Sequence, residues 1–232
     1  MAVLMTSGGS INSMSMEKLL SDYAHGDIVK IKEADVPVEF YVAKHDYESG
    51  LNGVGRTLLV RKDVHSNFQW SGSQSNNYSG CTIDVKLNDT FLATGVGVTD
   101  SYKEILPPNV RDAIGQTTFY YTPKGGSSVT TLSRSVFILS LTELGKSDSY
   151  INTEGSALPI ASRLVPAYYN GSTTTQWTRS PHKNGTTTAA AVTNTGGIKR
   201  DSLSNKFGIR PAFTLPSNSV FNPESNEFIK AV

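Results

Sequence analysis

Cysteine and charge are both scarce in this 232-residue chain. Cys81 is the only cysteine, which excludes a disulfide within the chain and a metal site built mainly from thiolates. Charged residues make up 18% and hydrophobic residues 38%, and both fractions are low for a folded domain. The net charge is +1 without any basic block, so nothing predicts binding to nucleic acid or to anionic membranes.

Long apolar runs are missing as well. No stretch approaches the roughly 20 residues of a membrane span, so we expect no membrane insertion. The sequence begins with four or five apolar residues that have no basic flank, too few for a signal peptide. We therefore expect the chain to fold in a cytoplasm and to act elsewhere only after cell lysis or assembly.

The common catalytic and metal-binding signatures do not occur. There is no Gly-x-Ser-x-Gly elbow, no Walker loop and no His-Glu-x-x-His. The stretch at 95–97 begins like a dinucleotide loop, but Asp100 stands where the third glycine belongs, which favours a turn. The four histidines have no second ligand at metal-site spacing, so we predict no metal, no bound calcium and no cofactor. Cys81 is interpreted as a buried structural thiol.

Serine, threonine, asparagine and glycine are abundant in place of charged and hydrophobic residues. This mix is typical of short strands joined by many turns. Hydrophobic alternation or runs predict strands at 29–31, 38–42, 58–60, 119–121, 136–141 and 209–215. Helical spacing predicts a short helix at 16–23 and two more at 82–91 and 107–115. Trp70 and Trp177 are expected to anchor the core, and Arg179 and Arg210 to satisfy loop carbonyls.

The segment 168–205 is dominated by Thr, Asn, Ser, Gly and Ala. A stretch so long and polar is expected to be a loop region on the surface, and loops of this length usually have a use. Tyrosine, asparagine and serine give large contact area and adaptable hydrogen bonding. We therefore predict a binding face between Tyr168 and Asp201. Its candidate contacts are Tyr168, Tyr169, Asn170, Gln176, His182, Lys183, Asn184, Asn194 and Lys199.

Several short blocks resemble a domain of unknown function found in gut bacteria and their phages. The resemblance spans roughly residues 26–218. The blocks are Val36–Tyr47, Leu58–Asp63, Ser140–Gly145, Asn152–Ile160, Trp177–Pro181 and Gly208–Phe213. The last two also resemble formylglycine-generating-enzyme-like domains and the variable proteins of diversity-generating retroelements. That wider group implies an α+β, C-type-lectin-like fold with mixed small sheets, two short helices and a long loop region.

The chain departs from that wider group in two respects. It has no cysteine after Cys81, whereas the enzymes of the group need cysteines near the C-terminus. It also lacks the Glu-Pro-Asn, Gln-Pro-Asp and Trp-Asn-Asp triplets of calcium-dependent lectins. Oxidase chemistry and calcium-dependent sugar binding are both disfavoured. The resemblance then implies only the scaffold, and any function would lie in its loop face.

The leading hypothesis is a non-catalytic ligand- or receptor-binding module on the outside of a bacteriophage particle, in the tail, baseplate or capsid exterior. Its partners would be a bacterial surface glycan or protein, and other virion subunits held through residues 1–12, with the chain itself a homo-oligomer. We expect an N-terminal arm and short helix at 1–25, the domain at 26–218, and a surface tail at 219–232. The alternatives are a purely structural virion protein, such as a capsid decoration or tail component, and a glycan hydrolase, whose paired carboxylates leave no sequence signature.

Overall fold

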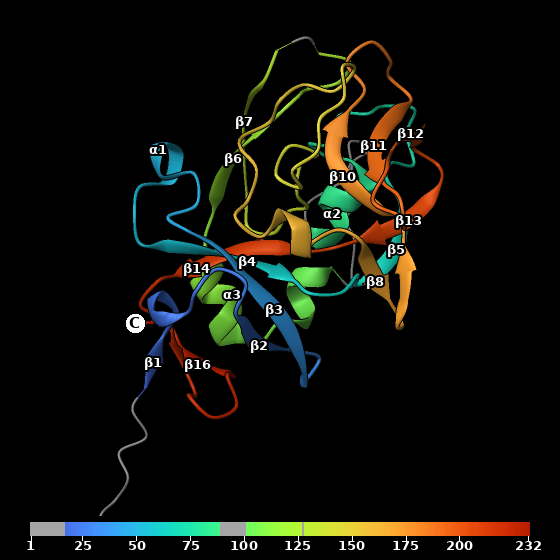
Figure 1. Cartoon of the computed structure of the whole chain (residues 1–232). Helices are drawn as coiled ribbons and strands as arrows, with labels where there is room; N and C mark the ends of the chain where they lie inside the picture. Colours follow the sequence, from blue (N-terminus) through green and yellow to red (C-terminus); the bar gives the residue numbers. More distant parts are fainter. Residues whose placement is uncertain (1–16, 89–100, 127) are drawn as a thin grey trace, which may run out of the picture.

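The computed structural model describes residues 17–88, 101–126 and 128–232, and Figure 1 shows their arrangement. The expected arm at 1–12, the start of the first predicted helix, Phe91 and the turn at 95–100 lie outside the described residues. Among those described, the longest α-helices have seven residues, and none could cross a membrane. Short strands in small sheets dominate, so the α+β class is confirmed.

The elements follow one another in a long series of short pieces. The strands are β1 (Lys18–Leu19), β2 (Ile28–Glu33), β3 (Val36–His45), β4 (Arg56–Arg61), β5 (Ser66–Gln69), β6 (Thr117–Tyr121), β7 (Thr130–Arg134), β8 (Ala167–Tyr169), β9 (Ser172–Thr174), β10 (Gln176–Pro181), β11 (Thr188–Val192), β12 (Ile198–Ser202), β13 (Lys206–Ile209), β14 (Ala212–Pro216), β15 (Val220–Phe221) and β16 (Phe228–Lys230). The helices are α1 (Ser49–Asn52), α2 (Thr82–Asn88) and α3 (Pro108–Ile114), with 3₁₀ helices η1 (Leu20–Asp22), η2 (Tyr102–Ile105) and η3 (Ala161–Arg163).

A four-stranded antiparallel sheet in the order β14-β4-β3-β2 carries the expected alternation. The turn between β2 and β3 consists of Ala34 and Asp35, both with positive φ (45° and 65°), the backbone that a tight two-residue hairpin needs. β14 pairs with β4, with Phe213 opposite Leu59. An early strand and the second part of the predicted 209–215 strand therefore share one sheet.

A five-stranded mixed sheet in the order β12-β11-β10-β13-β5 forms the other half of the molecule, at the upper right of Figure 1. Its central strand β10 is buried at all six positions, and four of the five residues of β11 are buried. The expectation that 168–205 is entirely a surface loop region is therefore wrong. Alanine, serine and threonine are small enough to pack closely, and hydrogen bonds satisfy the polar groups that this packing buries.

Two predicted strands are altered. The strand at 209–215 is split at Arg210–Pro211, so that Ile209 lies in the five-stranded sheet and Ala212 in the four-stranded one. Pro211 has no N–H group to continue the ladder of hydrogen bonds. The neighbouring strands β4 and β5 also lie in different sheets, because β14 pairs with β4 and β13 with β5. The chain thus passes from one sheet to the other here.

The segment 136–141 is buried, as expected, but it makes only one bridge, between Phe137 and Ala212. Many of the hydrogen bonds to its backbone N–H and carbonyl groups come from side chains instead. Ile138 N donates to the Tyr78 hydroxyl at 3.2 Å, and Leu141 N donates to Ser180 Oγ at 2.9 Å. The strand that pairs with β6 is β7, whose residues were not predicted to be extended.

The two ends of the described chain also differ from expectation. The helix predicted at 16–23 is reduced to the three-residue η1, because Lys18 and Leu19 pair with β15. The expected surface tail instead forms β15 and β16, and Val220 and Phe221 are buried. The helix predicted at 107–115 is confirmed as α3, with proline at its start and Gly115 (φ +60°) after its end.

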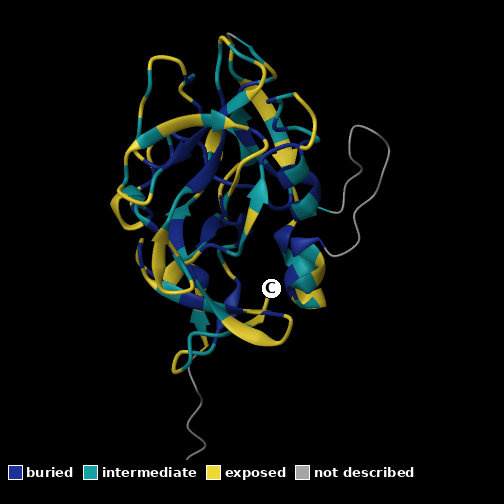
Figure 2. Ribbon diagram, turned by 90° about the vertical axis from the view of Figure 1, so that its right-hand side faces the viewer, coloured by how far each residue is buried: buried dark blue, intermediate teal, exposed yellow. Residues whose placement is uncertain are grey.

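A single apolar cluster joins both halves, and Figure 2 shows buried residues running through the interior of the molecule. Trp70 and Trp177 are buried in it, as predicted, and their indole N–H groups donate to Thr178 O and Phe68 O. Cys81 is buried too, and burial raises the pKa of its thiol, which suits a structural role.

Candidate functional site

The predicted contacts do not form one face. In the sheet, Gln176 pairs with Val192 and Pro181 with Ala189, so the turns at 182–187 and 193–197 lie at opposite ends of β10 and β11. A six-residue strand is about 20 Å long. His182, Lys183 and Asn184 lie at one end. Tyr168, Tyr169 and Asn170 lie on the β8–β9 hairpin toward the other end, as does Asn194 in its turn, with Lys199 on the edge strand β12.

Their exposure differs as well. Tyr168 is exposed, as are Asn170, Asn184, Asn194 and Lys199, whereas Tyr169, His182 and Lys183 are half-buried. Gln176 is buried, and its amide donates to Leu164 O at 2.9 Å, so it cannot contact a ligand as predicted. The Lys199 ammonium is held by Asp201 at 2.5 Å.

An aromatic cluster forms around Tyr150, which the sequence did not single out. The Tyr150 ring stacks on His182 with 5.4 Å between ring centroids, and the Arg200 guanidinium lies 4.5 Å from the Tyr150 ring centroid. Asp148 holds Arg200 at 3.7 Å, and Lys183 N donates to Tyr150 O at 3.0 Å. Tyr150 is nevertheless 43% exposed, so this end of the sheet presents an aromatic surface to solvent.

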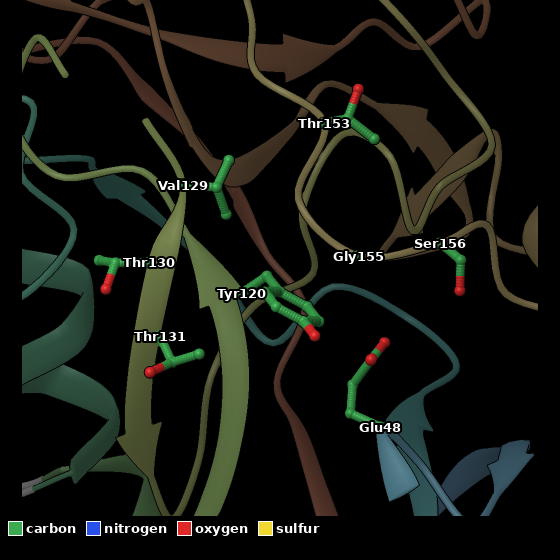
Figure 3. Close-up of a pocket in the computed structure, with 8 residues that line it drawn as sticks. All are labelled: Glu48, Tyr120, Val129, Thr130, Thr131, Thr153, Gly155 and Ser156. Carbon is green, nitrogen blue, oxygen red and sulfur yellow. The ribbon is translucent and has the colours of Figure 1, made fainter. Parts of the chain in front are cut away.

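A cavity of about 600 Å³, open to solvent, is lined in part by the loop at 153–156. Figure 3 shows three segments around it: the β6–β7 ribbon, the loop at 153–156 and the residue before α1. Ligand pockets commonly fall in this range of volume. The lining residues are Glu48, Tyr120, Val129, Thr130, Thr131, Thr153, Gly155 and Ser156.

Glu48 is the one charged residue of this lining. Its backbone is left-handed (φ 46°, ψ 53°), a conformation that costs a non-glycine residue about 1 kcal/mol or more. Its carbonyl accepts hydrogen bonds from Leu51 N and Asn52 N, which open α1 and fix the residue in place. Figure 3 shows the carboxyl group pointing toward the gap between Tyr120 and Ser156.

The Glu48 carboxyl group is poorly satisfied. Its Oε1 atom is buried and has no hydrogen-bond partner among the described residues, and the nearest cation, Lys44 Nζ, is 4.0 Å away. Burial raises the pKa of Glu48, an effect that Lys44 opposes. Gly155 (φ +79°) lets the loop at 153–156 come close to Glu48, because a Cβ at this position would lie only 3.3 Å from Glu48 Oε1.

A buried ionic network lies beneath this cavity. Arg179 is fully buried, and its Nη1 donates to Glu143 Oε2 at 2.6 Å and to Ile138 O at 2.9 Å. The Tyr47 hydroxyl donates to Glu143 Oε1, and Arg179 Nε donates to Tyr120 O at 3.0 Å. The predicted structural role of Arg179 is therefore confirmed. The network also fixes Tyr47 and Tyr120, which flank the pocket from below.

Two other acids near the pocket are unavailable to a ligand. Glu143 and Glu154 are both fully buried. Glu154 accepts hydrogen bonds from Thr122 N and Ser180 Oγ, each at 2.6 Å. Burial raises the pKa of Glu154, and the Arg179 charge opposes that rise. Glu48 is thus the only carboxylate that meets the cavity.

Metal ligands do not gather anywhere in the described ranges. Within 17–88, 101–126 and 128–232 no three His, Cys, Asp or Glu side chains come together as they would around a metal ion. The absence of a cofactor therefore stays a prediction.

Sequence reasoning missed Glu48, Tyr150 and Arg200. Tyr150 and Arg200 come together only in the fold, and Glu48 has Lys44 four residues before it, a common pairing that does not mark a site. His182 and Lys183 were found because they lie in a polar turn beside a tyrosine-rich stretch.

The chain belongs to a family known as a domain of unknown function (DUF6273), whose sequence model matches residues 54–217. The match covers seven of the eight pocket residues and leaves out Glu48. No curated protein and no solved structure matches the chain. The family carries no assigned chemistry, so function has to be argued from the site.

Proposed function

We propose that this chain is a non-catalytic binding module on the outside of a bacteriophage particle, and that the cavity beside Glu48 is its ligand site. The observation that supports this most is Glu48 Oε1, a buried carboxylate oxygen with no hydrogen-bond partner among the described residues, held at the wall of an open cavity. Folding leaves this group unsatisfied, whereas a bound donor would satisfy it. Strained, unsatisfied groups of this kind concentrate at functional sites.

Binding is favoured over hydrolysis because the cavity contains a single carboxylate. Glycoside hydrolysis ordinarily uses two acids that flank the bond to be cleaved. The neighbouring acids, Glu143 and Glu154, are buried and already bonded within the interior. A ligand in this cavity would therefore meet one acceptor and no second acid.

The scaffold is proposed to be C-type-lectin-like. In support, β14 from the end of the chain lies in one sheet with β2 to β4, and the loop-rich half is built around β10 and β13. The particle assignment is proposed from the family resemblance.

The test is adsorption of the labelled protein to a panel of gut bacteria. Glu48→Gln keeps the side chain's shape and removes its charge, so it should reduce adsorption strongly. Glu224→Gln makes the same change on an exposed residue of the β15–β16 hairpin and should leave adsorption unchanged. Immunogold electron microscopy of phage particles should place the protein on their exterior. Failure to adsorb to any strain would leave the purely structural alternative.

A further inference from the structure

We infer that the cavity beside Glu48 binds a saccharide unit without a metal ion, with the Glu48 carboxylate accepting hydrogen bonds from ligand hydroxyl groups and the Tyr120 ring packing against the sugar. This inference rests on the proposed binding function and names its ligand class. Four features of the cavity support it.

The first feature is the supply of free hydroxyl groups. Thr130, Thr131, Thr153 and Ser156 are all exposed, and the structure gives their hydroxyl groups no hydrogen-bond partner among the described residues. The same is true of the Tyr120 hydroxyl, since only the Tyr120 carbonyl is bonded. A hydroxyl group both donates and accepts. A ring of them suits a ligand that presents donors and acceptors on every side, as a sugar does.

The second feature is the charge balance. Lys44 Nζ already lies 4.0 Å from Glu48 Oε1 and would repel an ammonium ligand. An anionic ligand would be repelled by Glu48 itself. The cavity lining holds no other charged residue. A neutral ligand with strong hydrogen-bond donors is what remains, and its hydroxyl groups can approach Oε1 without a charge conflict.

The third feature is the scarcity of large apolar side chains in the lining. Val129 is its one aliphatic residue, and Tyr120 its one aromatic residue. A peptide partner would need a larger apolar anchor to fill the cavity. One half-buried ring beside several hydroxyl groups matches the CH-rich face and polar rim of a single sugar ring. Figure 3 shows the Tyr120 ring projecting into the space between Glu48 and the β7 threonines.

The fourth feature is the cost that Glu48 imposes on the fold. The residue has a left-handed backbone and a desolvated oxygen without a hydrogen-bond partner among the described residues, and a Cβ at position 155 would lie only 3.3 Å from that oxygen. Glutamine or asparagine would satisfy the same turn without a buried charge. An acid kept here under such conditions is best explained by a ligand that needs an ionised acceptor.

The experiment is a titration of the intact protein with methyl glycosides of the common hexoses, 6-deoxyhexoses and N-acetylhexosamines, followed by ¹H–¹⁵N NMR in EDTA. We expect at least one sugar to bind at millimolar concentrations and to shift the amide signals of Thr130, Thr131 and Gly155. Glu48→Gln should weaken that binding at least tenfold, the loss expected for a charge-assisted hydrogen bond. Glu224→Gln should bind as the wild type does, and unchanged spectra elsewhere show that each variant is folded.

The pH provides a second readout. Binding should weaken as the pH falls through the raised pKa of Glu48, because the protonated carboxyl group loses acceptor capacity. In Glu48→Gln the residual binding should not change over that range. Sugar binding that is unaffected by both the variant and the pH would overturn the role of Glu48.

A parallel adsorption assay separates this inference from the proposed function. If no glycoside binds, and adsorption to bacteria survives periodate oxidation of their surface glycans, the ligand is not a saccharide although the binding function stands. If no glycoside binds and nothing adsorbs, both fail. Sugar binding that is abolished by EDTA would also overturn the inference, since it would require a metal ion.

Discussion

The two main sheets bury their central strands by different means. In the β14-β4-β3-β2 sheet, apolar residues such as Leu58, Leu59 and Val60 fill the interior. In the centre of the other sheet, β10 buries Gln176, Arg179 and other polar residues, whose side chains bond to backbone carbonyls or buried acids. The comparison teaches that a polar segment can be core when most of its buried polar groups have defined partners, although Arg179 Nη2 has no hydrogen-bond partner among the described residues.

Each half of the molecule also contains a Tyr–Glu–Arg cluster. In the first, Glu33 accepts from the Tyr102 hydroxyl at 2.5 Å and from Arg61 Nε at 2.9 Å. In the second, Glu143 accepts from Tyr47 and Arg179. The arginine side chain is 14% exposed in the first cluster and fully buried in the second. The same interaction therefore has different solvent access in the two halves.

The largest effect is expected from Arg179→Met. The variant leaves Glu143 buried without its cation, and breaking a buried pair costs about 3–5 kcal/mol of unfolding free energy. Chemical denaturation should measure this loss. Adding Glu143→Gln should recover most of it, because the amide still accepts from Tyr47 and no unpaired charge remains. A double variant as unstable as the single one would contradict this account.

Arg61→Met should cost less, about 1.5–3 kcal/mol, the range for hydrogen bonds to charged groups. Glu33 keeps its contacts with Tyr102 and His65, and solvent reaches the site. A loss equal to that of Arg179→Met under the same denaturant conditions would mean that solvent access does not distinguish the two clusters.

The same variant should change the acid limb of the stability profile. Burial would raise the pKa of Glu33, but hydrogen bonds from His65 and Arg61 outweigh it and leave the pKa below its ordinary value. The stability that ionised Glu33 contributes is therefore present above the ordinary glutamate pKa and is lost as the pH falls through the lowered one. Without Arg61 the pKa rises toward its ordinary value, so denaturation curves measured across that range should show a smaller acid loss that is complete at a higher pH.

Gln176→Ala should cost only about 1 kcal/mol, the lower end for a lost hydrogen bond, because Leu164 O also accepts from Arg210 Nη1 at 2.7 Å. Arg210→Ala together with Gln176→Ala should cost more than the two single changes added, since the buried carbonyl then has no partner. A double-mutant cycle measures this coupling, and strict additivity would show that the two donors act independently.

The smallest effect has the opposite sign. Glu48→Gln should stabilise the fold at neutral pH by less than about 1 kcal/mol, because it removes a desolvated charge. The pKa of Glu48 is raised in the fold, so the destabilisation grows as the pH rises from the ordinary glutamate pKa through the raised one. Below that window the variant and the wild type should melt alike. A lower melting temperature for the variant at pH 7 would show that the ionised carboxylate is satisfied.

The sequence predicted the individual strands of the four-stranded sheet, because alternation at positions such as Val29 and Ile31 reports one buried face. It could not predict β10 and β11, where small and polar residues are buried on both faces and no alternation remains. Segment 136–141 was correctly expected to be buried, but its hydrogen-bond partners are side chains from distant segments. The tail was misjudged because β15 is only two residues long.

The candidate site was harder still to predict. Tyr168 and His182 were expected on one face, but the length of β10 separates them, and strand register cannot be read from composition. Glu48 carries no local pattern, and its significance comes from its backbone conformation and the loop opposite it. Both Arg179 and Arg210, in contrast, were correctly assigned, because an arginine next to a strand proline has few roles other than to satisfy carbonyls.

The pairing of β1 with β15 has a consequence for how this domain can be joined to other chains. Lys230 Nζ lies 3.2 Å from Glu17 Oε1, so the first and last described segments lie side by side, at the lower end of the molecule in Figure 1. A short linker between them would allow circular permutation, with new ends cut into an exposed turn such as the one at 194–195. The domain could also be inserted into a host protein as a single cassette, because both connections leave from the same place.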